Sequence, residues 1–522
     1  MKKLKTVENQ RDSYSQKSDQ RISPDYIGRK FCDSELVIGL VGAVGTRLDK
    51  IYEEIDDRLK LYGYNTKKIK ISEDIIPKIV DTTKINKTNE YDRISKYMDK
   101  GNEARRLSGD NSILALGAAA KIGEGRSESD PFRKRIAYVI SSLKHPEEVA
   151  MLREIYTEGF FLIGVYSDVS RRKEYLTTEK RIKADLAAEL IARDSDENLT
   201  HGQRTSYTFY LSDFFIRFDE NYYQWKKSIW RILDIIFGDP YKTPTFDEYA
   251  MFLAFAASLR SGDMSRQVGA VIAKDREIIA TGANDVPKSG GGLYWPIYNE
   301  ENFEITDEPK GRDFKRGKDS NKEEKDKIIA KIIESLKDLE LEESSKIKII
   351  DAVNKSGIKD ITEYGRAVHA EMEALLSCAR NNNSTKNADL YCTTYPCHNC
   401  AKHIIASGIK RVVYVEPYPK SKAEELHDDA LILEMSPTVS SHLVHLEPFV
   451  GIGPRRFFDL FSMSLGSGYP LIRKQENGEK YEWKTESAKL RIQMLPCSYI
   501  ERETVATSRF NTLRKEIKDE QQ

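Results

Sequence analysis

Residues 389–416 read DLYCTTYPCHNCAKHIIASGIKRVVYVE and show two apolar runs separated by a helical pattern. The first run predicts a strand at 389–394, and the second predicts a strand at 410–415. The segment 397–407 between them has the spacing of a helix. Strands that alternate with helices are typical of a parallel sheet covered by helices, so this part of the chain is α/β.

The same alternation continues upstream of this stretch. We expect helices at 247–260 and 369–380, and strands at 267–274 and 276–283. A charge-dense segment, 300–360, interrupts the pattern, and its second part has the spacing of one or two amphipathic helices. We interpret 300–360 as an inserted flap, either a solvated surface insertion or a substrate lid. The whole domain is placed at 246–460, after the boundary residues Gly238, Pro240 and Pro244.

A second α/β pattern occupies the N-terminal part of the chain, 31–180. Its expected strands are 35–41, 67–72, 135–141 and 160–166, and its expected helices are 47–62, 111–122 and 146–157. Around these domains we expect a disordered arm at 1–30, a helical bridge at 181–245 and a C-terminal extension at 461–522. The alternative for 181–245 is that it completes the first domain.

Composition excludes several classes of protein. The 522 residues contain 83 Lys and Arg and 83 Asp and Glu, so the formal net charge is zero. This balance argues against wholesale binding to a polynucleotide backbone, although a local basic patch remains compatible with it. The absence of a long apolar run predicts no transmembrane helix, and the polar N-terminus is not a signal peptide. Together with six scattered cysteines, these features favour a cytoplasmic location.

The residues with the clearest chemistry are His369-Ala370-Glu371 and Pro396-Cys397-His398-Asn399-Cys400. A Cys-x-x-Cys pair alone is compatible with a redox motif or half of a structural zinc site. With His369, however, the two cysteines supply three ligands, which is the number that a catalytic zinc needs beside an open position. Cys397 and Cys400 share one face in the first turn of a helix, where backbone N–H groups favour thiolates. Glu371 is then a carboxylate that lies beside the metal without binding it.

At this point the sequence resembles a known family. The segments VGAVI (268–272), TGANDVP (281–287), HAEMEALL (369–376) and 391–418 resemble the zinc-dependent cytidine and deoxycytidylate deaminases, over roughly 246–460. The resemblance implies a three-layer α/β/α domain with a mixed sheet and a Zn²⁺ cofactor. It also implies that Glu371 is the catalytic proton carrier and that Asn284 holds the pyrimidine nucleoside. Arg266, just before the first of these segments, is placed to meet a substrate phosphate or to remain a surface arginine.

A glycine-rich turn marks the N-terminal domain. Residues 39–46 read GLVGAVGT, and Gly39, Gly42, Gly45 and Thr46 follow a strand and open a helix, as in a phosphate-binding loop. The lysine of a P-loop is missing. The turn and residues 135–177 resemble P-loop kinases of the nucleoside-monophosphate-kinase type. We expect a nucleotide-sensing or degenerate kinase-like domain, and the alternative is a tight turn with no ligand.

The two halves together, with 415–430 and 448–461, resemble the bacterial anti-phage deoxycytidine nucleotide deaminases. This resemblance implies deamination of dCTP or dCMP during infection, and restraint by a nucleotide effector or an inhibitory small RNA. Deaminases of this fold commonly complete their sites across subunits, which favours a homo-oligomer. Two other functions remain open: a polynucleotide-editing deaminase acting on RNA or single-stranded DNA, and a non-enzymatic nucleotide sensor with a structural zinc site.

Overall fold

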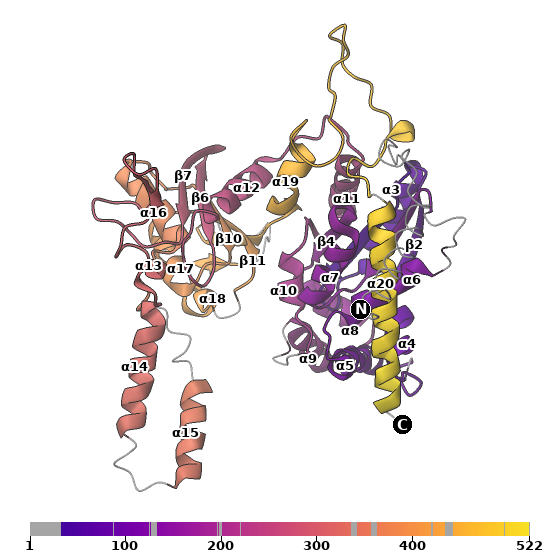
Figure 1. The fold of residues 1–522 in the computed structure, drawn as a ribbon, viewed down its shortest axis with the longest axis horizontal. Helices are drawn as coiled ribbons and strands as arrows, with labels where there is room; N and C mark the ends of the chain where they lie inside the picture. Colours follow the sequence, from indigo (N-terminus) through magenta and orange to yellow (C-terminus); the bar gives the residue numbers. More distant parts are fainter. Residues whose placement is uncertain are drawn as a thin grey trace, which may run out of the picture.

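The computed structural model describes residues 33–86, 88–124, 126, 133–195, 197, 201–219, 221–335, 342–355, 363–418, 421–433, 442–494 and 496–520. The arm expected at 1–30 lies outside these residues. The structure contains two six-stranded sheets, each covered by helices (Figure 1). The first is built from the N-terminal part of the chain and one late strand, Gly451–Ile452, so the second domain ends before the expected residue 460. Within the described residues, no helix is both long and apolar enough to cross a bilayer.

The first sheet has the strand order β14-β5-β4-β1-β3-β2 and is parallel except at β14. Alternate residues of β1 point into two cores: Leu36, Ile38 and Leu40 face one side, and Val37 and Val41 face the other. The first core is covered by α3 and α11, and the second by α6, α7 and α20. The bounds are β1 Leu36–Gly42, β2 Asn65–Lys70, β3 Ile136–Ser141, β4 Phe160–Tyr166, β5 Phe214–Arg217, β14 Gly451–Ile452, α3 Leu48–Leu61, α6 Ile113–Gly123, α7 Pro146–Tyr156, α11 Tyr222–Ile236 and α20 Pro496–Glu520.

The expected helical bridge at 181–245 is wrong in one respect. It contains β5, whose buried residues Phe214, Phe215 and Ile216 extend the first sheet beside β4. This apolar strand has only four residues and lies between two helices in the sequence, so neither the strand nor its pairing was predicted. Because α11 also packs on this sheet, the segment completes the first domain.

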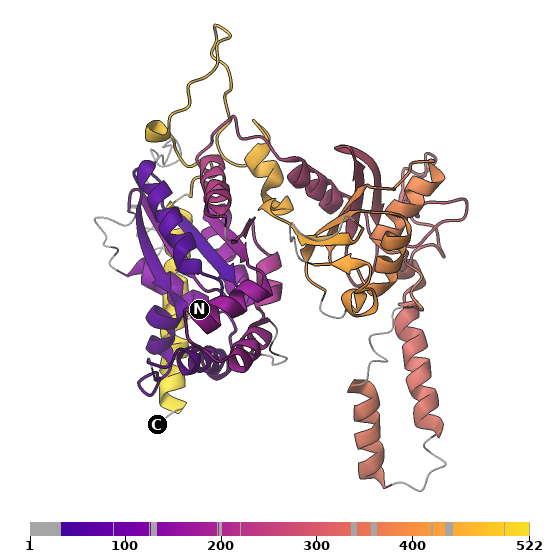
Figure 2. The ribbon, with the colours of Figure 1, turned by 180° about the vertical axis from the view of Figure 1, so that it is seen from behind.

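The C-terminal extension returns to the first domain (Figures 1 and 2). Helix α20 lies along α6, where the Phe510 ring packs against Gly117. A buried ionic network holds the same helix in place: the Arg126 guanidinium bridges the carboxylates of Glu35 and Glu503 at 3.0 and 2.7 Å. The last helix of the chain is therefore part of the N-terminal core.

The second sheet has the order β12-β13-β11-β10-β6-β7. It is mixed, because β6 runs antiparallel to both β7 and β10, while β10, β11, β13 and β12 run parallel to one another. Helix α12 covers one face, and α16 and α17 cover the other, which gives the three layers that the resemblance implies. The bounds are β6 Gly269–Lys274, β7 Glu277–Ala283, β10 Asp389–Thr394, β11 Arg411–Glu416, β12 Leu431–Ile432, β13 Val444–Pro448, α12 Phe246–Ser258, α16 Ala370–Arg380 and α17 His398–Ala406.

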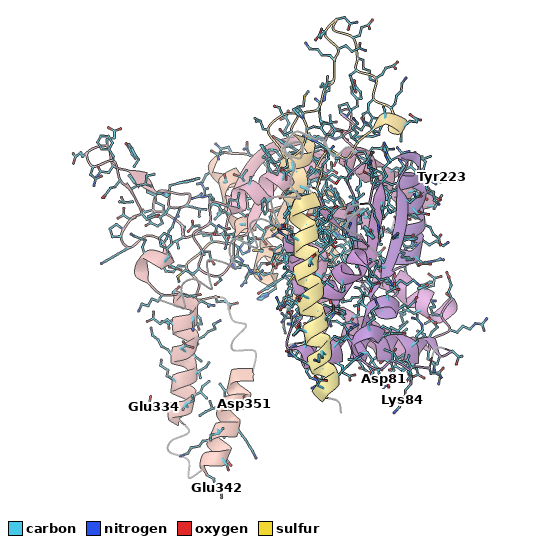
Figure 3. All side chains as sticks on the ribbon, turned by 45° about the vertical axis from the view of Figure 1, so that its right-hand side comes forward. Asp81, Lys84, Tyr223, Glu334, Glu342 and Asp351 are labelled. Atoms are coloured by element: carbon cyan, nitrogen blue, oxygen red, sulfur yellow. The ribbon has the colours of Figure 1, made fainter. Side chains whose placement is uncertain are left out.

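The insertion within 300–360 projects from this domain as a helical hairpin (Figures 1 and 2). It contains α13 (Asp313–Arg316), α14 (Ser320–Ser335) and α15 (Glu343–Lys355). In Figure 3, Glu334 and Asp351 lie on the two arms of the hairpin, and Glu342 lies at its far end. The hairpin joins the domain at its base, next to α13 (Figure 1).

Candidate active site

The three predicted metal ligands lie together beside the second sheet. His369 is the N-cap residue of α16, Cys397 is the N-cap residue of α17, and Cys400 follows in the first turn of α17. The His369 Nδ1 atom is 3.3 Å from the Sγ atoms of both cysteines. These donor atoms lie within 4.8 Å of one another and are the one such cluster among the described residues. The structure thus brings two helix starts to one point.

The electrostatics of this cluster suit a cation. Hydrogen bonding by Cys400, followed by the effect of His369, lowers the pKa of the Cys397 thiol to about 4 despite its burial. The same contact with Cys397 raises the pKa of His369 to about 9. The Cys397 thiolate in turn raises the pKa of Cys400. A half-buried imidazole and two buried thiols supply the nitrogen and sulfur donors that zinc prefers, so the residues present fit Zn²⁺.

Glu371 lies in the first turn of α16, two residues after His369, and is 4% exposed. Burial raises the pKa of its carboxyl group. Glu371, His369 and Cys397 all line one cavity of 280 Å³. A buried carboxyl group that retains its proton more readily than usual is suited to accept and donate a proton inside this cavity.

The two predicted substrate residues also line this cavity. Asn284, at the end of β7, accepts the Val268 N–H at 2.7 Å through Oδ1 and donates to the Arg266 carbonyl at 2.9 Å through Nδ2. It therefore fixes the backbone of the cavity wall. The half-exposed Arg266 side chain lies over the Tyr418 ring, 5.6 Å from its centroid, and 3.7 Å from Glu416. Arg266 is therefore a solvent-exposed residue of the cavity lining.

Sequence reasoning kept a substrate lid as one interpretation of the insertion but named none of its residues. Asp313, Asp319 and Asn321 belong to the base of the hairpin and line the same cavity. Arg366, three residues before His369, holds this base in place: it bonds to the Asp313 carboxylate at 2.6 Å and to the Gly311 carbonyl at 3.0 Å. No local motif distinguishes these residues within a segment where charges of both signs are dense. The base of the insertion is thus a wall of the cavity.

The glycine-rich turn is only partly as expected. Gly42, Gly45 and Thr46 line a second cavity of 570 Å³ in the first domain. Gly39 lies instead within β1, and a Cβ atom there would be 2.8 Å from the Leu143 and Phe160 side chains. Gly39 therefore permits close packing and does not belong to the turn.

Comparison with known proteins supports the assignment of the second domain. Residues 244–416 match the family model for the cytidine and deoxycytidylate deaminase zinc-binding region. The deoxycytidylate deaminase of Enterobacteria phage T4 is 32% identical over 170 residues, which is 33% of this chain and 77% of that protein. The deoxycytidylate deaminase of Mycobacterium phage D29 is 29% identical over 174 residues, 33% of this chain and 94% of the relative. The chain belongs to the cytidine and deoxycytidylate deaminase family.

Among solved structures, the dCMP deaminase of the cyanophage S-TIM5 in apo form is 17% identical, with a TM-score of 0.22. The match covers 40% of this chain and 99% of that structure. The family model begins at residue 244, after the first five strands of the N-terminal sheet.

Proposed function

We propose that this protein is a zinc-dependent deaminase that converts deoxycytidine nucleotides, dCMP or dCTP, to the corresponding uracil nucleotides and releases ammonia. The observation that carries the proposal is one cavity lined by two of the three clustered donors, His369 and Cys397, and by the buried carboxyl group of Glu371. The deoxycytidylate deaminases of phages T4 and D29 support the choice of a deoxycytidine nucleotide.

Each residue of the cavity has a role in this reaction. Zinc held by His369, Cys397 and Cys400 supplies a Lewis acid that makes water nucleophilic near neutral pH. Glu371 accepts a proton from the water that adds to C4 of cytosine and donates it to N3. The second water proton then moves through Glu371 to the exocyclic amine, the C4–N bond breaks, and ammonia leaves.

The cavity favours a free nucleotide over a strand. Its volume of 280 Å³ is at the lower end of small-molecule sites. Asp263 and Asp319 contribute negative charge to the wall, which disfavours a long phosphodiester backbone. The solvent-exposed Arg266 is suited to the phosphate of one nucleotide, while Asn284 positions the wall that faces the nucleoside.

The association of the two domains suggests a biological setting. We infer that the deaminase acts in the cytoplasm as a homo-oligomer and depletes DNA precursors during phage infection, under control of a nucleotide effector or a small RNA. Comparing phage plaque formation on cells that carry the wild-type protein or Glu371→Gln tests this setting: protection should require Glu371, and equal protection by both proteins contradicts it.

The decisive test of the chemistry is an assay of purified protein with dCMP, dCTP, CMP and a cytosine-containing oligonucleotide, in which uracil products and ammonia are measured. We expect activity on dCMP or dCTP. Glu371→Gln should lower kcat by about 10²- to 10⁴-fold while bound zinc stays at the wild-type level. Activity confined to the oligonucleotide would refute the proposed substrate, and an unchanged rate for Glu371→Gln would refute the role of Glu371.

A further inference from the structure

The glycine-rich turn of the first domain already holds an anion, and this anion belongs to the protein itself. Asp194, at the end of α9 (Ala184–Ser195), is fully buried. Its Oδ2 atom accepts the backbone N–H of Val44, in the middle of the turn, at 2.7 Å. Backbone N–H groups in such a turn, between a parallel strand and a helix, are suited to phosphate oxygens. In this structure a carboxylate occupies that role.

A lysine accompanies the carboxylate. Lys144, three residues after β3, donates through Nζ to the Gly42 carbonyl at 2.8 Å and to both Asp194 oxygens at 2.8 and 3.0 Å. Its side chain is 15% exposed. The turn lacks the lysine that follows the glycines of a P-loop. Lys144, which follows the neighbouring strand β3, places an ammonium group beside the turn instead. An ammonium group beside backbone N–H groups is what a phosphate requires.

The second cavity lies against this ion pair, at the carboxyl ends of β1, β2 and β3. Three of its lining residues have a buried polar atom with no hydrogen-bond partner among the described residues: Thr46 at Oγ1, Arg105 at Nε and Gln203 at Oε1. Gln203 is 6% exposed and Arg105 is 1% exposed. The lining holds six basic side chains and four acidic ones, and Glu90 among the acidic ones pairs with Lys180. Unsatisfied buried polar atoms and an excess of basic side chains in a cavity of 570 Å³ point to a polar, anionic ligand.

We propose that this cavity binds a phosphorylated ligand by exchange with Asp194. The phosphate takes the Val44 N–H and the Lys144 ammonium, and the Asp194 carboxylate leaves them. A buried ammonium group needs one anionic partner, whereas a carboxylate and a phosphate at the same place repel each other. Asp194 therefore competes with the ligand, and the apparent affinity of the cavity is lower than its intrinsic affinity.

The test uses the full chain and pyrophosphate without magnesium, with binding measured by isothermal titration calorimetry. We expect Asp194→Asn to bind pyrophosphate about tenfold or more tightly than the wild type, because the competitor has lost its charge. Lys144→Met should weaken binding by a similar factor. Asp56→Asn is the matched control: it changes the net charge equally, but Asp56 pairs with Lys60 outside the lining of this cavity, so the affinity should not change.

Several outcomes would overturn the exchange. These are weaker or equal binding by Asp194→Asn, binding that survives Lys144→Met, and no binding by either the wild type or Asp194→Asn. A repeat with magnesium separates another role: if Asp194→Asn weakens binding only when magnesium is present, Asp194 is a metal ligand and no competitor.

A measurement on the wild-type protein covers the case in which Asp194→Asn does not fold. Pyrophosphate should slow hydrogen exchange of the amides in 42–46 and accelerate exchange at the end of α9, because Asp194 is released. Slower exchange in both segments would mean that the carboxylate stays in place, and it would overturn the proposal. Zinc content and deamination rate provide independent checks, so failure here is distinguishable from failure of the deaminase assignment.

Discussion

Gly282 controls how closely helix α16 approaches the second sheet. It lies in β7, and a Cβ atom built there would be 2.1 Å from the Ala370 carbonyl oxygen and 2.6 Å from the Ala374 nitrogen. Both atoms belong to the backbone of α16. Ala370 directly follows the metal ligand His369, so the contact acts on the part of the helix that builds the site. Gly282→Ala is therefore expected to disturb the site without touching a ligand.

The size of the disturbance follows from the distances. Ordinary contacts of a Cβ atom begin at 3.4 Å, and the obstructing atoms are backbone, so they cannot move aside by rotating. The first turn of α16 must then retreat by about 1 Å, and a misplacement of this size costs about 10²-fold in rate. Overpacking of this kind also destabilises the fold by about 1 to 3 kcal/mol. We expect a large loss of kcat on dCMP together with a reduced zinc content.

Two glycine variants serve as controls. Gly101→Ala, in α5 (Glu90–Ser108), places its Cβ 3.6 Å from the nearest atom and should leave activity and zinc unchanged. Gly269→Ala produces an overlap of similar severity, 1.9 Å from the Ala254 carbonyl oxygen of α12, on the sheet face away from the ligands. Gly269→Ala should lower the free energy of unfolding while the protein keeps its bound zinc. Wild-type kcat and zinc content in folded Gly282→Ala would refute the reasoning.

Three further outcomes are expected. Burial lowers the pKa of His145 below its usual 6.5, so the folded state favours the neutral ring, and the free energy of unfolding should decrease as the pH falls below about 6.5. In urea unfolding at pH 7 and pH 5, the wild type should lose about 1 to 2 kcal/mol more of this free energy than His145→Asn, and equal losses would contradict this. Cys397→Ala should lose bound zinc, measured by elemental analysis, whereas Cys378→Ala, also at a buried cysteine, should keep it; retention in both would rule out Cys397 as a ligand. Arg126→Met leaves the buried carboxylates of Glu35 and Glu503 without this cation and should lower the free energy of unfolding by about 3 to 5 kcal/mol, with no change in the urea midpoint counting against the network.

Local patterns predicted most of the elements that build the site. The helices expected at 369–380 and 397–407 are present as α16 and α17 within a residue or two of the expected bounds, and both strands of 389–416 are confirmed. The metal cluster was predictable because a Cys-x-x-Cys pair at a helix start fixes two donors locally, and a family motif identified the third.

Features that depend on distant parts of the chain were not predictable. Helix α5 was not foreseen, because its buried face includes Gly101, Ala104 and Arg105 and so lacks a strong apolar stripe. The pairing of β6 with β10 joins residues more than a hundred positions apart, so the mixed sheet came from the family resemblance and not from local patterns. Lys144 lies 102 residues after Gly42, the residue of the turn that it contacts, so no local spacing rule could assign it to a phosphate site.

The two candidate sites share one physical principle. Each concentrates backbone N–H groups and charged side chains in a buried place, and each satisfies them with an ion pair from within the chain: His369 with Cys397 in the second domain, and Lys144 with Asp194 in the first. Such a pair satisfies the buried polar groups before the ligand arrives, but the ligand must then displace a proton or a carboxylate in order to bind. Zinc would replace the proton of His369, and both members of that pair would remain as its ligands. In the proposed exchange, by contrast, a phosphate would displace the Asp194 carboxylate. Phosphate affinity in the first domain should therefore rise when Asp194 is neutralised without loss of the remaining contacts, which is what Asp194→Asn measures, whereas loss of His369 or Cys397 should weaken zinc binding.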